Sequence, residues 1–196
     1  MYSVRGPIGQ KEFVVSREGG LTEEELSNEN ILRIVQTSRS TDLEVNTLVW
    51  KGLGYRLVNE EWTADQVFPK WKEKYPTPPD LIGMQRVYEP EIDKPSLKAN
   101  QALVRSVPVE YKQGLKKNLK PLGWNGYKYA ELTPNKTRRA QCANWLLYYR
   151  EALFGYTLEE LLEQKRKKQE AAAAEAAKLE AEGKEPEWKP PVKEVL

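Results

Sequence analysis

The stretch TPNKTRRAQCANWLLYYREALFG, from Thr133 to Gly155, decides the fold of this chain. Thr133 is a good N-cap residue, Pro134 suits the first helical position, and Gly155 suits the residue that follows a helix. At about 100° per residue, the apolar side chains of this stretch share one face of the helix. That face carries Cys142, Trp145, Leu146, Tyr149 and Leu153. The sequence therefore predicts a long helix with one buried side, against which the rest of the chain packs.

The residues before position 60 predict two more helices. Thr22 and Glu25 have the spacing of a capping box, and the helix that follows carries the apolar run at 31–35 inward. Asp42 is a suitable cap for a second helix, which Gly54 would end. The pair is typical of a helical hairpin.

The middle of the chain gives weaker signals. Residues 55–58 and 61–62 have the β-prone composition of a small hairpin, although neither turn residue between them is glycine. Residues 81–84 could form one more strand. Pro95 and Pro108 each stand where a helix would begin, because proline is tolerated in a first helical turn.

These signals predict a mainly α protein: a compact helical domain with at most a small β-hairpin, flanked by an extended N-terminal arm and a C-terminal charged helix. The arm spans residues 1–20 and is rich in glycine, so we expect it to be ordered only where something covers it. The helical core spans residues 21–163. Residues 164–196 form a charged, alanine-rich helix and a proline-rich tail, and a capping box at Thr157 and Glu160 opens this last helix.

The composition limits the catalytic and metal-binding chemistry that this chain can carry out. The chain contains no histidine and one cysteine, Cys142, so it lacks the residues that most often serve as general base, activated nucleophile or transition-metal ligand. No catalytic constellation, metal site or cofactor motif is recognisable, and we interpret Cys142 as a buried apolar residue. A lone cysteine favours a reducing compartment. No apolar run reaches the roughly 20 residues that a membrane-spanning helix needs.

The net charge of +2 conceals an uneven distribution. Residues 17–66 hold ten acidic against five basic side chains, whereas residues 112–139 hold eight basic side chains and one acidic, Glu131. Opposite charges on one small domain suit an electrostatically oriented contact with a partner. The candidate partner-binding residues are Lys116, Lys117, Lys120, Trp124, Lys136, Arg138 and Arg139.

Two interpretations of the arginines stay open. In the structural one, Arg138 pairs with a carboxylate of the acidic N-terminal hairpin while the apolar face is core. In the functional one, Arg138, Arg139 and Lys136 bind an anion or an acidic partner. Cationic side chains near the start of a helix oppose its dipole, so something else must favour them there, which supports an external or buried anionic partner.

The basic stretch from Lys112 to Arg139 also has alternatives. It interleaves Trp124, Tyr127 and Tyr129, which is the composition of a nucleic-acid surface. The lysines could equally form a solvated helix face with the aromatic rings in the core, or a surface that contacts a protein or a membrane.

Three long segments resemble a known family. They are VNTLVWKGLGYR (Val45–Arg56), the run from Phe68 to Gly123 that begins FPKWKEKYPTPPDLIG, and LTPNKTRRAQCANWLLYYREALFG (Leu132–Gly155). They are similar to a family of cyanobacteria and of algal and plant plastids that is defined by domain of unknown function 1823. The resemblance covers roughly residues 25–163 and implies a setting in oxygenic photosynthesis, but it transfers no functional residue.

Two hypotheses follow from the residues and the resemblance together. The first is a non-enzymatic accessory protein of the photosynthetic apparatus, an assembly factor or peripheral subunit that contacts a photosystem or other thylakoid complex through its basic surface and flexible ends. It would lie in the plastid stroma, on the stromal face of the thylakoid, or in the cyanobacterial cytoplasm. The alternative is a nucleic-acid-binding protein that uses the same basic stretch. An enzyme that works with two carboxylates and a small-molecule substrate is a third, less favoured class.

Overall fold

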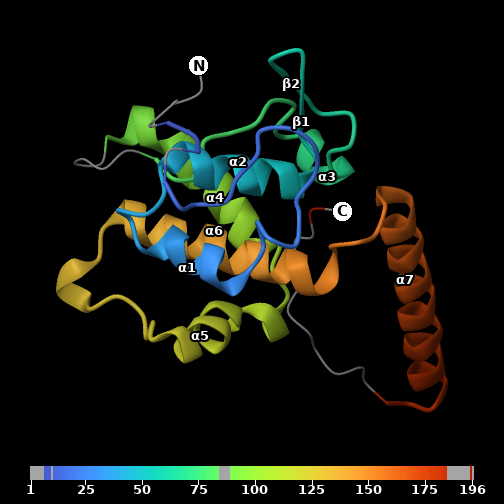
Figure 1. Cartoon of the computed structure of the whole chain (residues 1–196). Coiled ribbons are helices and arrows are strands. Elements are labelled where there is room, and N and C mark those ends of the chain that lie inside the picture. Colours follow the sequence, from blue (N-terminus) through green and yellow to red (C-terminus); the bar gives the residue numbers. More distant parts are fainter. Residues whose placement is uncertain (1–6, 10, 84–88, 185–194, 196) are drawn as a thin grey trace.

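Helix α6 (Pro134–Ala152) is the axis of this computed structural model, and the other helices of the core surround it (Figure 1). The structure describes residues 7–9, 11–83, 89–184 and 195. Four helices pack directly against α6: α1 (Asn28–Val35), α2 (Asp42–Leu53), α4 (Pro90–Arg105) and α5 (Gly114–Leu119). The fold that results is a helical assembly around one long central helix.

The remaining elements are small or peripheral. Strands β1 (Arg56–Val58) and β2 (Glu61–Thr63) form a two-stranded antiparallel hairpin, and the short helix α3 (Pro69–Lys72) follows it. Asn59 and Glu60 form the turn with φ of 49° and 65°, so the left-handed conformation of a two-residue hairpin is reached here without glycine. Helix α7 (Leu158–Ala181) is the last described element. The prediction of a mainly α fold with one small hairpin is confirmed.

The predicted face of α6 is the core of the molecule. Cys142, Trp145 and Leu146 are fully buried and Leu153 nearly so, while Tyr149 is half-buried. The Trp145 ring lies so close to α2 that a Cβ at Gly52 would come within 2.8 Å of it. A glycine in the last turn of α2 therefore lets the two helices approach each other.

Several helix ends are where the sequence predicts them. The Thr133 hydroxyl accepts from the Lys136 N–H at the start of α6, at 3.2 Å. A capping box links Thr157 and Glu160 at the start of α7, and Gly54 ends α2 with φ of 102°. These predictions succeed because each depends on hydrogen bonds between residues a few positions apart.

The start of the first helix differs from the prediction. The capping box of Thr22 and Glu25 forms, with hydrogen bonds of 2.9 and 3.2 Å, but it closes a single turn. Helix α1 begins at Asn28, with Ser27 as its cap. The Glu25 carboxylate is also bound by Lys51 at 2.5 Å, so a long-range contact holds the turn where a local pattern suggested a helix.

Asp42 is not the cap of α2. Thr41 takes this position: its hydroxyl accepts from the Glu44 N–H, and the Glu44 carboxylate accepts from the Thr41 N–H. Asp42 is the first residue inside the helix, and its carboxylate serves a different contact, described below. Thr41 and Asp42 are both good N-cap residues, so the sequence alone does not show which of the two caps the helix.

Two predictions in the middle of the chain are wrong. Helix α4 begins at Pro90, with Glu89 as its N-cap, so Pro95 lies inside the helix instead of starting it. Pro108 precedes a short 3-10 turn at Val109–Tyr111, and α5 begins only at Gly114. In the first case an earlier proline already occupied the favoured first position of the helix.

Residues 81–83 are not a strand. The backbone N–H of Leu81 donates to the Asn46 side chain and that of Ile82 donates to the Asp80 side chain, each at 3.0 Å. The backbone N–H groups of this segment therefore bind polar side chains, and not the backbone of a neighbouring strand. Met84, the last residue of the expected strand, lies outside the described residues.

The N-terminal arm is extended, but its described part is packed on the core. Phe13 is buried, with 3% of its surface exposed. Asn30 of α1 accepts from the Val14 N–H and donates to the Val14 carbonyl, both at 2.8 Å, as a neighbouring strand would. Ser16 donates its N–H to Glu25 and accepts from Lys51. The sequence predicted an arm that is ordered only where something covers it, and at residues 13–16 the cover is the core itself, whose buried polar side chains bind the backbone of the arm.

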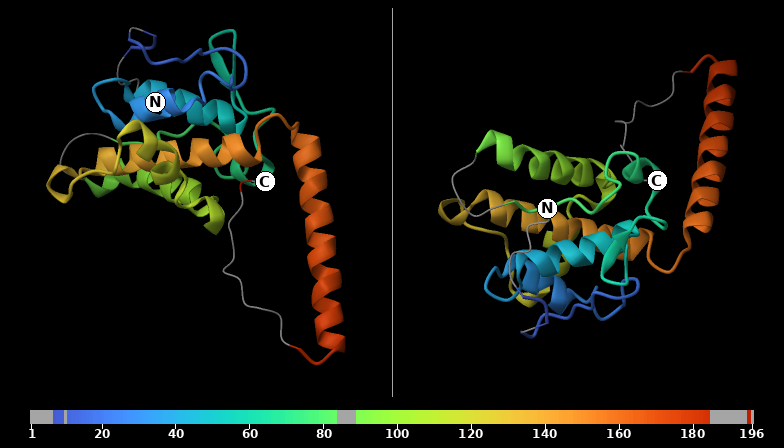
Figure 2. Two further views of the ribbon diagram at one scale, coloured as in Figure 1. Left: turned by 60° about the horizontal axis from the view of Figure 1, so that its bottom comes forward. Right: turned by 90° about the horizontal axis from the view of Figure 1, so that it is seen from above.

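Helix α7 projects away from the body of the molecule (Figure 2). Leu161 is buried near its start, whereas the residues from Arg166 to Lys178 are all exposed. Residues 185–194 and 196 lie outside the described residues, so the predicted proline-rich tail is not described. Among the described residues, no helix is both long and apolar enough to cross a membrane.

The substitution Phe13→Ala should lower the free energy of unfolding by about 3 kcal/mol, because it leaves a cavity where the arm meets the core. Urea denaturation followed by tryptophan fluorescence measures this change. Tyr129→Ala is the matched control, since Tyr129 is 93% exposed and its ring fills no cavity. Equal effects of the two substitutions would show that the arm is not part of the folded unit.

Candidate functional site

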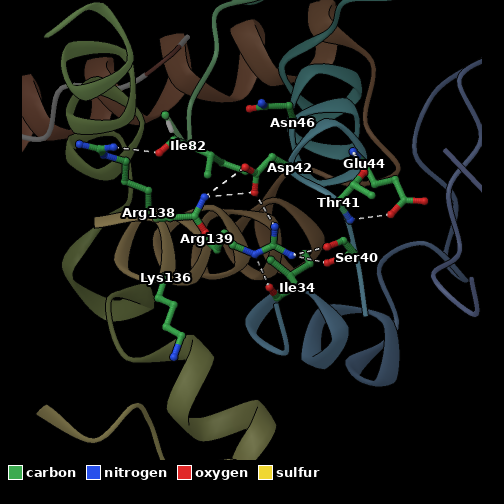
Figure 3. A network of polar contacts seen from close by, with 12 residues as sticks. Ile34, Ser40, Thr41, Asp42, Glu44, Asn46, Ile82, Lys136, Arg138 and Arg139 are labelled. Carbon is green, nitrogen blue, oxygen red and sulfur yellow. Dashed lines mark hydrogen bonds and ion pairs between the residues drawn. The ribbon is translucent and has the colours of Figure 1, made fainter. Parts of the chain in front are cut away.

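The two adjacent arginines of α6 point in different directions (Figure 3). Arg139 is 1% exposed and all three of its guanidinium nitrogens have partners. Nε donates to the Ile34 carbonyl at 2.8 Å, Nη1 to Asp42 Oδ1 at 2.7 Å, and Nη2 to the carbonyl and hydroxyl of Ser40 at 3.0 and 2.5 Å. Arg139 therefore joins α6 to the end of α1 and the start of α2.

This network corrects the structural interpretation of the sequence. A carboxylate of the N-terminal hairpin does pair with an arginine of α6, but the arginine is Arg139 and not Arg138. Asn135 adds two further hydrogen bonds to the Asp42 carboxylate, at 3.1 and 3.2 Å. Because Arg139 is enclosed by these contacts, it does not lie on the accessible surface where a partner would bind.

Arg138 is also buried, with 6% of its surface exposed, yet its surroundings differ. Its Nη1 donates to the Ile82 carbonyl at 2.9 Å, and within the described part of the chain it forms no ion pair. The guanidinium lies against Gly83, where a Cβ would collide with Nη1. Arg138 lines a hollow of about 420 Å³ between α4 and α6.

Lys136 extends away from both arginines (Figure 3). Its Nζ lies 5.5 Å from the centre of the Tyr127 ring, a cation–π contact. The Tyr127 hydroxyl donates to the Val35 carbonyl at 2.7 Å, and burial raises the pKa of this phenol to about 12. Trp124 packs edge-on against Tyr127 with 5.7 Å between the ring centres.

The lysines of α5 are on its outer side. Leu115 and Leu119 are buried against the core, whereas Lys116, Lys117 and Lys120 are exposed. This exposure fits the solvated helix face that the sequence left open, and it equally fits a surface that contacts a partner. The half-buried Trp124 is compatible with the same interpretation, in which the aromatic rings belong to the core.

A second hollow, of about 370 Å³, lies beside this helix. Its wall combines α4, α5, α6 and the loop at 123–132, and it is mostly apolar, with two lysines among its lining. We call it the basic groove. Its principal lining residues are Val104, Val107, Lys112, Leu115, Lys116, Trp124, Tyr127, Leu132 and Ala140.

The surroundings of the basic groove are both apolar and cationic. Four large apolar side chains are exposed between positions 109 and 132, where the chain forms α5 and the adjoining turns: Val109, Leu122, Tyr129 and Leu132. Six lysines accompany them: Lys112, Lys116, Lys117, Lys120, Lys128 and Lys136. Within residues 7–9, 11–83, 89–184 and 195, none of these lysines forms an ion pair.

The two hollows adjoin each other. Leu132, Thr137 and Gln141 line both of them, so the basic groove continues along α6 towards Arg138. Of the residues predicted from sequence, Lys116 and Trp124 line the first hollow and Arg138 the second. Lys117 and Lys120 lie outside both linings, and Arg139 lies in the interior.

Sequence reasoning did not find the apolar wall of the groove. Val104 and Val107, at the end of α4, have no local pattern that distinguishes them from other core residues. The exposed Leu132 could have been found, because it stands beside the cap of the long helix and outside its buried face. A cationic rim over apolar walls can bind an amphipathic, acidic molecule or segment.

Cys142 lies on the buried side of α6. Its burial raises the pKa of the thiol to about 12, while the nearby Arg139 acts in the opposite direction. The Asn100 side chain lies 3.9 Å from the sulfur. The cysteine has the environment of an apolar core residue, as the sequence suggested.

Comparison with known proteins identifies the family. The sequence pattern of domain of unknown function DUF1823 matches residues 25–151, and the chain belongs to this family. A solved solution NMR structure of a protein is 39% identical to the chain, with 68% of this chain and 96% of that one covered and a TM-score of 0.48. No curated protein matches the sequence.

Arg139→Met should lower the free energy of unfolding by about 3–5 kcal/mol, because it leaves the Asp42 carboxylate buried without its cation. Lys136→Met removes a charge three residues closer to the helix start and should cost less than about 1 kcal/mol, the usual range of an exposed cation–π contact. Chemical denaturation measures both. A small effect of Arg139→Met would contradict the role of this ion pair in joining the helices.

The thiol of Cys142 should resist modification in the folded protein. Because its pKa is raised to about 12, the thiol stays protonated at every pH below that value, and the reactive thiolate is scarce at pH 8. Reaction with a disulfide reagent should therefore be slow in buffer and fast in denaturant, where the ordinary pKa returns. Fast reaction of the native protein would contradict this burial.

Proposed function

We propose that this protein is a non-enzymatic accessory protein that attaches to an acidic, partly apolar surface of a protein complex through the basic groove. One observation carries the proposal: six lysines without ion-pair partners among the described residues accompany an apolar hollow and four exposed apolar side chains. Among the described residues no carboxylate lies within ion-pair distance of these six charges. A partner with acidic and apolar side chains would supply both kinds of contact.

A protein partner accounts for the aromatic residues better than nucleic acid does. Trp124 and Tyr127 are half-buried and pack edge to face at the groove, and the Lys136 ammonium lies over the Tyr127 ring, so both are less accessible for base stacking than exposed rings would be. Tyr129 is the fully exposed ring in this region. Acidic side chains at Glu23, Glu24 and Glu29 are exposed on the N-terminal part of the domain, which suits an oriented protein contact.

The setting that we propose is the photosynthetic apparatus of a cyanobacterium or plastid, with the protein attached peripherally to the stromal side of a thylakoid complex or present in the surrounding compartment. Its support is the resemblance of the three long segments to the DUF1823 family. The partner in this proposal is a photosystem or another thylakoid complex, and no small-molecule substrate is involved.

The described part of the N-terminal arm packs on the core of its own domain. We therefore propose that α7, and not this part of the arm, contacts the partner. This helix is exposed over most of its length and carries mixed charges, with Arg166 paired to Glu163 and Glu170 at its surface. Such a helix contributes little to the core and is available to pack on a partner.

The double substitution Lys116→Glu and Lys117→Glu should weaken attachment to the partner complex by about tenfold or more, because like charges then face each other. Co-migration of the tagged protein with thylakoid complexes on a native gel measures attachment. Lys72→Glu with Lys74→Glu, at the end of α3 and just after it, is the matched control, since it changes the net charge equally at exposed positions that line neither hollow.

The alternative function is nucleic-acid binding through the basic stretch from Lys112 to Arg139. Binding to generic RNA, measured over a range of salt concentrations, distinguishes it from attachment to a protein. Nucleic-acid binding would give a steep dependence on salt, and each neutralised lysine would reduce the log–log slope by about 1. Steep RNA binding, together with unchanged co-migration of the groove variant, would overturn the protein-docking proposal.

A further inference from the structure

Arg138 is a buried cation that forms no ion pair with any residue that the structure describes. Three basic side chains of the described chain are buried: Lys51, Arg138 and Arg139. Lys51 pairs with Glu25 at 2.5 Å and Arg139 with Asp42 at 2.7 Å, whereas Arg138 has no ion pair among the described residues. Within the described part of the chain, the core therefore provides counter-ions for two of its buried cations and none for the third.

Such a residue is costly for the folded chain alone. Removing a charge from water costs several kcal/mol unless an opposite charge or enough hydrogen bonds replace the lost solvent. A guanidinium has five N–H donors, and the described partner of Arg138 is one carbonyl, that of Ile82.

The remaining donors of Arg138 have room for a ligand. Arg138 lines the hollow of about 420 Å³ between α4 and α6. Gln101, Thr137 and Gln141 line it too, and in the part of the chain that the structure describes their side chains form no hydrogen bond. Amide and hydroxyl groups near a guanidinium are the donors that a carboxylate accepts from.

The guanidinium is also held in place. Nη1 is fixed by the Ile82 carbonyl, and the backbone at Gly83, which has φ of 76°, packs against the same nitrogen. Any side chain at Gly83 would push the guanidinium away from this position. A fixed, planar donor group is suited to two parallel hydrogen bonds with a carboxylate.

We propose that Arg138 binds a carboxylate group in the hollow between α4 and α6, and that an acidic side chain of the protein docked in the basic groove supplies it. The assignment of this source rests on the proposed function, because Leu132, Thr137 and Gln141 line both hollows and make them continuous. The sequence suggested that Arg138, Arg139 and Lys136 share one anion. The structure separates them and leaves Arg138 as the residue with unused donors.

The experiment uses the full chain and the side-chain Nε–Hε resonance of Arg138 in a ¹H–¹⁵N NMR spectrum. The probes are an acetylated and amidated peptide of glutamate and leucine, the same peptide with glutamine in place of glutamate, and succinate. The glutamate peptide should shift the Arg138 resonance saturably, and the glutamine peptide should not. Succinate tests whether a small free dicarboxylate suffices.

Arg138→Lys is the variant to compare, because it keeps the charge and removes the planar fork. It should weaken binding of the glutamate peptide by about tenfold, the equivalent of ~1.4 kcal/mol. Arg105→Lys is the matched control, since Arg105 is an exposed arginine at the end of α4, and it should leave binding unchanged. If Arg138→Lys does not fold, the shift of the Arg138 resonance in the unmodified protein, compared between the glutamate and glutamine peptides, still tests the carboxylate site.

The outcomes separate this inference from the proposed function. An Arg138 resonance that does not move, while the peptide binds and Lys116→Glu with Lys117→Glu abolishes that binding, would overturn the carboxylate site and leave groove docking intact. A resonance that moves with succinate but not with the glutamate peptide would overturn the docked partner as the source. Movement with the glutamate peptide, weakened in Arg138→Lys, supports the proposal in full.

Discussion

The ion pair between Arg139 and Asp42 is the contact on which the arrangement of the helices depends. It lies at the junction of α6 with the connection between α1 and α2, and it is nearly inaccessible to solvent. A buried ion pair of this kind adds little stability compared with a well-packed apolar pair, but removing one partner is costly. Its effect is directional: the three nitrogens of Arg139 require Ile34, Ser40 and Asp42 to be in one place, and so they fix how α1 and α2 meet α6.

The same physical constraint explains why Arg138 and Arg139 have different roles. Adjacent residues on a helix point about 100° apart, so two neighbouring side chains face different neighbours. Arg139 faces the helical hairpin, where a carboxylate is present, and Arg138 faces the gap between α4 and α6, where the described residues offer a carbonyl. The dipole at the start of α6 disfavours both cations, and only one of them is compensated within the described chain.

The N-terminal arm shows a related use of buried polar groups. Asn30, Glu25 and Lys51 bind the backbone of residues 14–16, and Phe13 fills the core beside them. This arm lies before the region that the DUF1823 pattern matches, whereas the side chains that hold it lie within that region. The groove on α5 and the 123–132 loop is formed by other elements, so the arm can be packed while the cationic surface remains exposed.

The sequence by itself determined the mainly α class, the start and buried face of α6, the end of α2 at Gly54 and the start of α7 at Thr157, because periodicity and capping are local properties that a few neighbouring residues define. It also located the basic stretch, since charge is a property of composition. Tertiary structure alone decided which arginine meets Asp42, because two adjacent arginines are equivalent in sequence and differ only in what each faces. It likewise decided that Val104 and Val107 would join Trp124 and Leu132 in one groove, since these residues come from separate elements that meet only through the packing of α4 and α5 on α6.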